Sequence, residues 1–161
     1  MISIRGRKAI AASSLFTFVL LGTGIVSPVF AILGEDRATI RSEWQNLPYR
    51  HESAVKSGYT VETLIRPEST IHEYFDSDGK IFAVSWRGTE MPDLERLFGR
   101  YFQEFQAGLA ERRKSVRVRR IPVHLKTEHL VVETGGKPRE LWGRAYLHSL
   151  LPAGVSEEEI R

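Results

Sequence analysis

Two of the five histidines are each followed by a glutamate, which is how a zinc-protease motif begins. The two pairs are His51-Glu52 and His72-Glu73. The motif needs a second histidine four residues after the first, so that both imidazoles share one face of a helix. Those places hold Val55 and Asp76, and the remaining histidines have no ligand spacing either. Because the chain also has no cysteine, we predict no metal site and no cofactor.

Two carboxylates, Glu62 and Glu73, fall in consecutive segments that alternate like β-strands. Opposed across a hairpin, they would suit general acid–base catalysis, which makes a small hydrolase with a carboxylate or histidine site one hypothesis. The alternative for both residues is a solvated face of a sheet. Ser85 lacks the flanking glycines of a nucleophile elbow, since Ala83 and Arg87 occupy those places. The sequence therefore assigns no catalytic residue and favours a protein that is not an enzyme.

The strongest concentration of charge is a basic run between Arg112 and Arg120, with six cations in nine residues. One interpretation is the end of a helix followed by a strand with a solvated face, because cations are favourable near a helix C-terminus. The functional interpretation is a contact surface for an anionic partner, such as a lipid headgroup, a polysaccharide phosphate or an acidic protein. Under that hypothesis the contact residues are Arg113, Lys114, Arg117, Arg119 and Arg120.

Aromatic residues are spread over the second half of the chain, where they would suit a pocket for a small molecule. A small-molecule carrier is therefore a third hypothesis. In so short a chain the same residues are expected to form the core instead. The set comprises Trp86, Phe98, Tyr101, Phe102, Phe105, Trp142 and Tyr146.

The 161 residues carry 23 basic and 20 acidic side chains, a formal net charge of +3. The excess lies in the first 31 residues, which contain Arg5, Arg7 and Lys8 and no acid. A long uncharged segment follows these cations, and Val29-Phe30-Ala31 is typical of a signal-peptidase site. We therefore predict a cleavable signal peptide over residues 1–31 and a periplasmic or extracellular protein that binds no nucleic acid. Retained, the segment would instead anchor the protein to the cytoplasmic membrane.

Residues 32–161 are long enough for one small domain. Apolar residues at helical spacing between Glu35 and Leu47 predict a short N-terminal helix, and the polar residues up to Gly58 predict a connection. From Pro92 onward, leucine and aromatic residues at spacings of three and four predict a long amphipathic helix. Period-two alternation predicts strands at residues 59–66, 70–75, 81–87, 115–123, 128–133 and 139–147.

Turn signals separate several of these strands. Asp76-Ser77-Asp78-Gly79 and Gly135-Gly136-Lys137-Pro138 are both typical of hairpin turns. Short links favour antiparallel pairing, so we predict an α+β fold. Its antiparallel β-sheet of five to six strands would carry the long helix on one face. In this division residues 32–58 are the N-terminal helix and connection, 59–151 the sheet–helix core and 152–161 a tail.

A set of short runs occurs in a fixed order from about Leu33 to the C-terminus. The runs are Phe82-Ala83-Val84-Ser85-Trp86-Arg87-Gly88, Pro92-Asp93-Leu94, Gly99-Arg100-Tyr101-Phe102, Leu130-Val131-Val132-Glu133, Gly135-Gly136, Gly143-Arg144-Ala145-Tyr146-Leu147 and Leu151-Pro152-Ala153-Gly154-Val155. This order resembles a bacterial family described as domain of unknown function 2844. His148 stands where that family has a proline, and Glu90-Met91 replaces a Gly-Pro-rich turn. The resemblance implies export, and it supplies no activity, cofactor or catalytic residue.

These observations together favour a non-catalytic exported protein that binds an envelope or extracellular partner. The hydrolase and the small-molecule carrier are the alternatives. Polar side chains converging in a concave pocket would favour the enzyme, and a deep apolar pocket would favour the carrier. A flat charged or apolar patch would favour the binding module.

Overall fold

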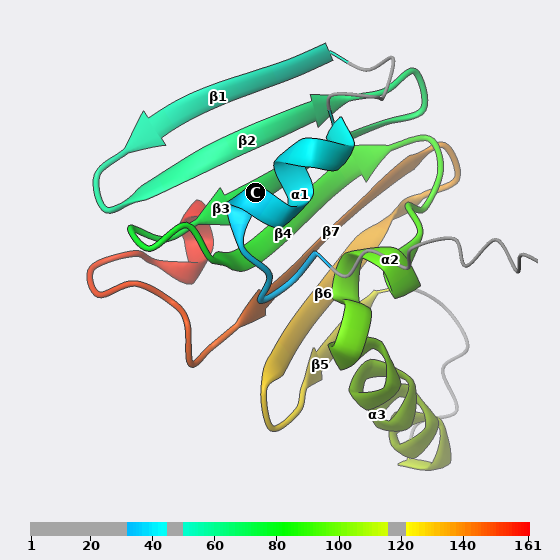
Figure 1. The fold of residues 1–161 in the computed structure, drawn as a ribbon. Coiled ribbons are helices and arrows are strands. Elements are labelled where there is room, and N and C mark those ends of the chain that lie inside the picture. Colours follow the sequence, from blue (N-terminus) through cyan, green and yellow to red (C-terminus); the bar gives the residue numbers. More distant parts are fainter. Residues whose placement is uncertain (1–31, 45–49, 116–121) are drawn as a thin grey trace, which may run out of the picture.

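The computed structural model describes residues 32–44, 50–115 and 122–161 (Figure 1). Along the chain the elements are α1 (Arg37–Trp44), β1 (Arg50–Lys56), β2 (Tyr59–Ile65), β3 (Ser69–Phe75), β4 (Ile81–Gly88), α2 (Leu94–Phe98), η1 (Gly99–Tyr101), α3 (Phe102–Ser115), β5 (Val123–Lys126), β6 (Leu130–Lys137), β7 (Glu140–Leu147) and η2 (Glu157–Glu159).

Seven strands form one antiparallel sheet in the order β1-β2-β3-β4-β7-β6-β5. The α+β prediction is confirmed, but the predicted count of five to six strands is wrong. The unexpected strand is β1, which we predicted to be a polar connection. All seven of its residues are exposed, so it has no buried face and hence no apolar alternation in its sequence. It forms one edge of the sheet and pairs with β2 along its whole length.

The helices cover one face of the sheet, called here the helix face (Figure 1). Its core joins the start of the described chain and α1 to α2, α3 and the central strands. Trp86 is central to it, because its ring lies directly over Gly143 of β7, where a Cβ would sit 2.2 Å from the ring. The largest fully buried residues of this cluster include Trp86, Phe75, Phe98, Leu33, Ile40, Ile81, Leu130 and Leu147.

The opposite face, called here the tail face, carries a second and smaller core under the C-terminal residues 150–161. Val155 and Ile160 of this segment are buried against side chains from β2, β3, β4, β6 and β7. The buried members from the sheet are Tyr59, Tyr74, Phe82, Ala83, Val131 and Tyr146. A sheet with an apolar cluster on each face also needs some cover on each, and the C-terminal segment supplies part of it here.

The predicted long helix corresponds to α2, η1 and α3 in succession. Asp93 caps α2, with its carboxylate accepting a hydrogen bond from the Arg96 amide at 3.1 Å. Gly99 then takes φ 51° and ψ −122°, outside the helical range, so the axis breaks before α3. The apolar stripe, which is the set of leucine and aromatic residues that predicted this helix, still contacts the sheet. The ring centroids of Phe98 and Trp86 lie 6.1 Å apart. In the described ranges, no helix has both the length and the apolar character needed to cross a membrane.

Two strand and turn predictions need correction. The strand expected at residues 115–123 is β5 at Val123–Lys126, whereas Ser115 ends α3 and residues 116–121 lie outside the described ranges. The turn of the last hairpin is Pro138-Arg139, with Arg139 at φ 67°, and not the two preceding glycines. Those glycines extend β6. A Cβ at Gly135 would lie 2.5 Å from the Trp142 ring, so the glycine makes room for the indole.

Candidate functional site

Every strand contributes one polar residue to a single line across the tail face. Each member is the register partner of the next. Residues two positions along the strands, such as Tyr74, Ala83 and Val131, belong to the tail-face core, so alternation places the line on that face. We call this line the polar row: Glu52, Thr63, His72, Ser85, Arg144, Glu133 and His124.

Hydrogen bonds orient the middle of the polar row. Thr63 Oγ1 lies 2.9 Å from Nδ1 of His72, and Ser85 Oγ lies 3.2 Å from the hydroxyl of Tyr74. Burial lowers the pKa of His72 from its ordinary value of 6.5, because the charged imidazolium would lose hydration. His72 is therefore a neutral ring at neutral pH, and its orientation is held through Nδ1.

Arg144 links the polar row to the C-terminal segment. Its Nε donates to Glu133 Oε2 at 2.7 Å, and its Nη1 donates to the carbonyls of Glu157 and Ile160. Glu133 Oε1 also lies 2.9 Å from Nδ1 of His124. The hydrogen bond from Arg144 is the main reason that the pKa of Glu133 falls below its ordinary value. Glu133 and Arg144 thus neutralise each other within the floor of the site.

The C-terminal segment forms a wall beside the polar row. The Tyr74 hydroxyl donates to the Arg161 carbonyl at 2.8 Å and accepts from the Arg161 amide at 2.9 Å. The Tyr59 hydroxyl donates to Glu159 at 3.0 Å, and Ile160 is fully buried. These contacts hold the segment against the sheet. Ser85 of the polar row is buried at 2% exposure, whereas Arg87 and Trp142 of the next row stay exposed.

Between this wall and the end of the sheet lies an open groove of about 720 Å³. Its lining comes from the polar row, from the C-terminal segment and from two side chains of the next row, Arg87 and Trp142. These two are direct partners across β4 and β7. Trp142 is 39% exposed and its ring lies over Gly135, which leaves the outer side of the indole open to the groove. The groove therefore combines an exposed aromatic ring with pre-oriented polar groups.

The Glu133–Arg144 contact predicts a pH dependence of stability. A carboxyl whose pKa is lowered by folding stabilises the fold above its unfolded pKa, and the contribution is lost as pH falls through the folded pKa. We expect Glu133→Gln to lower Tm at neutral pH. The Tm difference between the variant and the parent should shrink as the pH falls below 4.5, the ordinary pKa of a glutamate. Thermal melts across this range test it. As a control, Glu111→Gln removes an exposed pair with Lys114 and should change Tm little at any pH.

The two carboxylates considered for acid–base catalysis do face each other, because Glu62 and Glu73 are register partners in β2 and β3. They lie on the helix face, however, at 2% and 1% exposure, and so they are not solvated. Arg37 Nε donates to Glu62 Oε1 at 2.6 Å, and His51 Nε2 lies 3.0 Å from Oε2. Glu62 is buried under α1 and bound by Arg37 and His51, so it is not accessible to a substrate.

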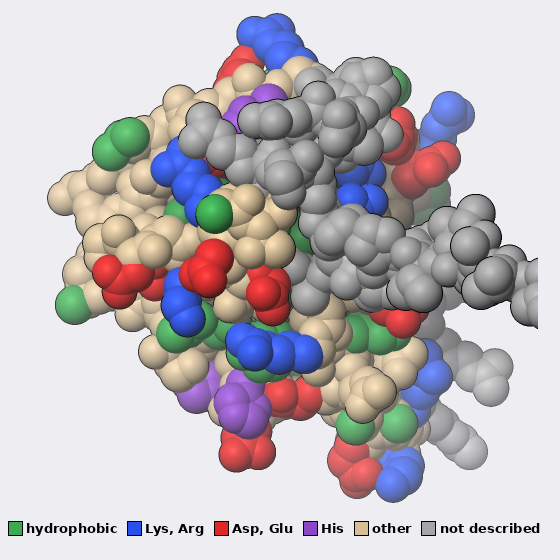
Figure 2. Space-filling model, viewed as in Figure 1, with side chains coloured by type: hydrophobic (Ala, Val, Ile, Leu, Met, Phe, Trp, Pro, Cys, Tyr) green, Lys and Arg blue, Asp and Glu red, His purple; other side chains and the backbone are tan. Residues whose placement is uncertain are grey.

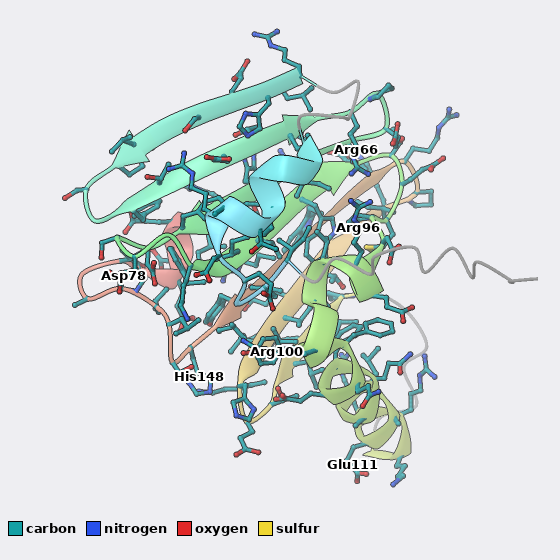
Figure 3. The ribbon with its side chains drawn as sticks, viewed as in Figure 1. Arg66, Asp78, Arg96, Arg100, Glu111 and His148 are labelled. Carbon is teal, nitrogen blue, oxygen red and sulfur yellow. The ribbon has the colours of Figure 1, made fainter. Side chains whose placement is uncertain are left out.

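A small cavity adjoins Glu73 on the same face. It has about 20 Å³, which holds roughly one water molecule. Arg66, which follows β2, and Arg96 of α2 both line it, and Figure 3 shows the two close together at that end of the sheet. The cavity has no room for a substrate beside Glu73.

The histidines have structural partners spread over the molecule. His51 contacts Glu62, His129 Nδ1 lies 3.1 Å from Glu104, and His148 contacts the carbonyl of Glu128. Within the described ranges, no group of three or more potential ligands could hold a metal ion.

The basic run is only partly within the described residues. Arg113 and Lys114 are exposed in the last turn of α3, whereas Arg117, Arg119 and Arg120 lie outside the described ranges. Lys114 Nζ is 2.8 Å from Glu111 and is therefore already paired. On the side seen in Figure 2, basic and acidic side chains among the described residues are interspersed. The hypothesis that this run contacts an anionic partner stays a prediction.

The sequence did not single out this groove. Trp142 belongs to the aromatic set that suits either a small-molecule pocket or the core, and no role was predicted for Arg87. The available signal was the hairpin itself, in which Gly135 stands opposite Trp142 once the turn is placed at Pro138-Arg139. A glycine opposite a tryptophan leaves room for the indole ring to lie across the neighbouring strand. Because Trp142 is on the tail face, its ring stays exposed there.

Comparison with known proteins identifies a family for this chain. The family model described as "Protein of unknown function (DUF2844)" matches residues 29–160. No curated protein and no solved structure matches the chain. Because the family model covers all but the N-terminal segment and the last residue, the chain belongs to the DUF2844 family.

Proposed function

We propose that this protein is a non-catalytic binding module of the cell envelope or extracellular space that binds a carbohydrate in the tail-face groove. The observation that carries the proposal is the exposed indole of Trp142 beside the fixed polar row. A flat aromatic ring packs well on the C–H face of a sugar ring, and oriented donors and acceptors suit its hydroxyls.

The hydrogen bonding of the groove supports binding over hydrolysis. A serine nucleophile needs an adjacent base, and a general base needs a free acceptor aimed at the substrate. Among the described contacts, Ser85 bonds to Tyr74 and the His72 ring bonds to Thr63, with no bond joining the serine to the histidine. The groove is also open and lined by charged side chains, which does not suit a carrier of apolar molecules.

Export of the protein is part of this proposal and rests on the basic, apolar and Val29-Phe30-Ala31 segments in order. The described fold is consistent with cleavage after Ala31. Leu33 is fully buried, and the amides of Ile32 and Leu33 donate to the Arg96 and Leu97 carbonyls at 3.2 and 3.1 Å. We expect N-terminal sequencing of the exported protein to begin at Ile32. A sequence beginning at Met1 would instead support the membrane anchor.

Carbohydrate binding is tested by titrating the purified protein with neutral and acidic oligosaccharides. We expect Trp142→Ala to weaken binding by about tenfold or more, as for a central aromatic contact. Trp142→Phe should retain most of the affinity, because it keeps an aromatic face. Val55→Ala is the matched control, since Val55 is an exposed apolar residue of β1, outside the groove. Equal binding by the parent and Trp142→Ala would contradict the proposal.

A further inference from the structure

We infer that the ligand of the groove is an acidic saccharide, whose carboxylate is bound by Arg87 while its ring packs on Trp142. This inference rests on the proposed function and specifies the chemical class of its ligand. It comes from a difference between two of the arginines that line the groove, Arg87 and Arg144.

Arg144 is fully committed to the protein. Its Nε and Nη2 contact Glu133, both at 2.7 Å, and its Nη1 donates to main-chain carbonyls of the C-terminal segment. Arg87 is exposed, and its side chain forms no ion pair or hydrogen bond with any of the described residues. It follows that Arg87 keeps its donors available to a ligand, whereas Arg144 shapes the floor.

The remaining charges of the groove offset one another. Glu133 is balanced by Arg144, and His72 is held neutral by burial. The C-terminal wall contributes one side chain of each sign, Glu158 and Arg161. The three arginines that line the groove outnumber its two glutamates by one, and this excess of positive charge favours an anionic ligand.

The placement of Arg87 suits one sugar residue. Because it is the register partner of Trp142 on the same face, the two side chains start about 5 Å apart and can contact one ring together. A guanidinium presents a planar fork that binds both oxygens of a carboxylate. A uronic acid offers both features, an apolar ring face and a carboxylate attached to that ring. A neutral sugar would leave the arginine without its partner.

The test compares each acidic oligosaccharide with its own methyl ester, which removes the charge and keeps the ring. Oligomers of galacturonate, glucuronate and mannuronate and their esters are titrated calorimetrically into the purified protein. We expect at least one acid to bind about tenfold more tightly than its ester, as for a charge-assisted hydrogen bond. Added salt should reduce this preference.

Three variants separate the contributions. Arg87→Gln should abolish the preference for the acid while ester binding remains, and Arg87→Lys should retain part of the preference. Trp142→Ala should weaken binding of acid and ester alike. Both residues, Arg87 and Trp142, are exposed, and thermal melts check that each of the three variants folds.

The possible outcomes distinguish the acidic ligand from carbohydrate binding as such. Equal binding of acid and ester, with Trp142 still required, would overturn this inference and leave the proposed function standing. A preference that survives in Arg87→Gln would overturn the role of Arg87. If neutral oligosaccharides bind but none of the acids or esters does, this inference is overturned and the proposed function stands. Binding of no oligosaccharide, neutral or acidic, would overturn both.

Discussion

Replacing Phe98 with alanine is expected to lower the free energy of unfolding by about 3–5 kcal/mol, a large part of the stability of a small domain. Phe98 is fully buried where α2 meets the sheet. Its ring centroid lies 5.1 Å from that of Phe105 and 6.1 Å from that of Trp86, so its removal opens a cavity between helix and strand. Chemical denaturation of parent and variant measures the loss.

Phe102→Ala provides the matched control in the same stripe. Phe102 lies at the centre of the apolar stripe in the sequence, yet it is only partly buried and lines an open hollow with Leu94 and Leu109. We expect its truncation to cost about 1–2 kcal/mol, since little cavity forms. A loss for Phe102→Ala as large as that for Phe98→Ala would contradict this account of the helix face.

Gly143→Ala is expected to destabilise the fold by about 3 kcal/mol through overpacking, although it adds a single methyl group. The new Cβ would lie 2.2 and 2.5 Å from two ring atoms of Trp86, which is 2% exposed and cannot move away freely. The clash is relieved only by shifting the indole into Phe98 or by separating β4 from β7.

Two further variants make the origin of this loss measurable. Gly108→Ala in α3 meets only the ends of flexible side chains at 2.9 to 3.1 Å, and alanine favours the helix by about 1 kcal/mol, so its net effect should be small. In a Trp86→Leu background, Gly143→Ala should cost less than in the parent, because the ring is gone. An unchanged cost in that double-mutant cycle would place the strain elsewhere.

Local signals were sufficient to predict much of the sheet from the sequence. The alternation in β2, β3 and β4 and the turn at Asp76-Ser77-Asp78-Gly79 are found as expected, with Gly79 at φ 80° and Asp76 accepting two main-chain hydrogen bonds. These features depend on side-chain period and turn chemistry, which are properties of a few consecutive residues. The same reasoning failed for β1, because its own residues carry no alternation. Its strand conformation follows from pairing with β2, which the structure shows.

By itself the sequence determined the α+β class, the central strands, the helical segment from Leu94 and the resemblance to the family, because these follow from periodicity and short runs of residues. Only the tertiary structure decided the functional surfaces. Whether a strand residue faces α1 or the C-terminal segment depends on which side each is packed, and alternation alone does not say which face is covered. That choice buried Glu62 and Glu73 on the helix face, where they are not accessible to a substrate. On the opposite face it left Trp142 and Arg87 exposed side by side, because the C-terminal segment covers only the neighbouring rows.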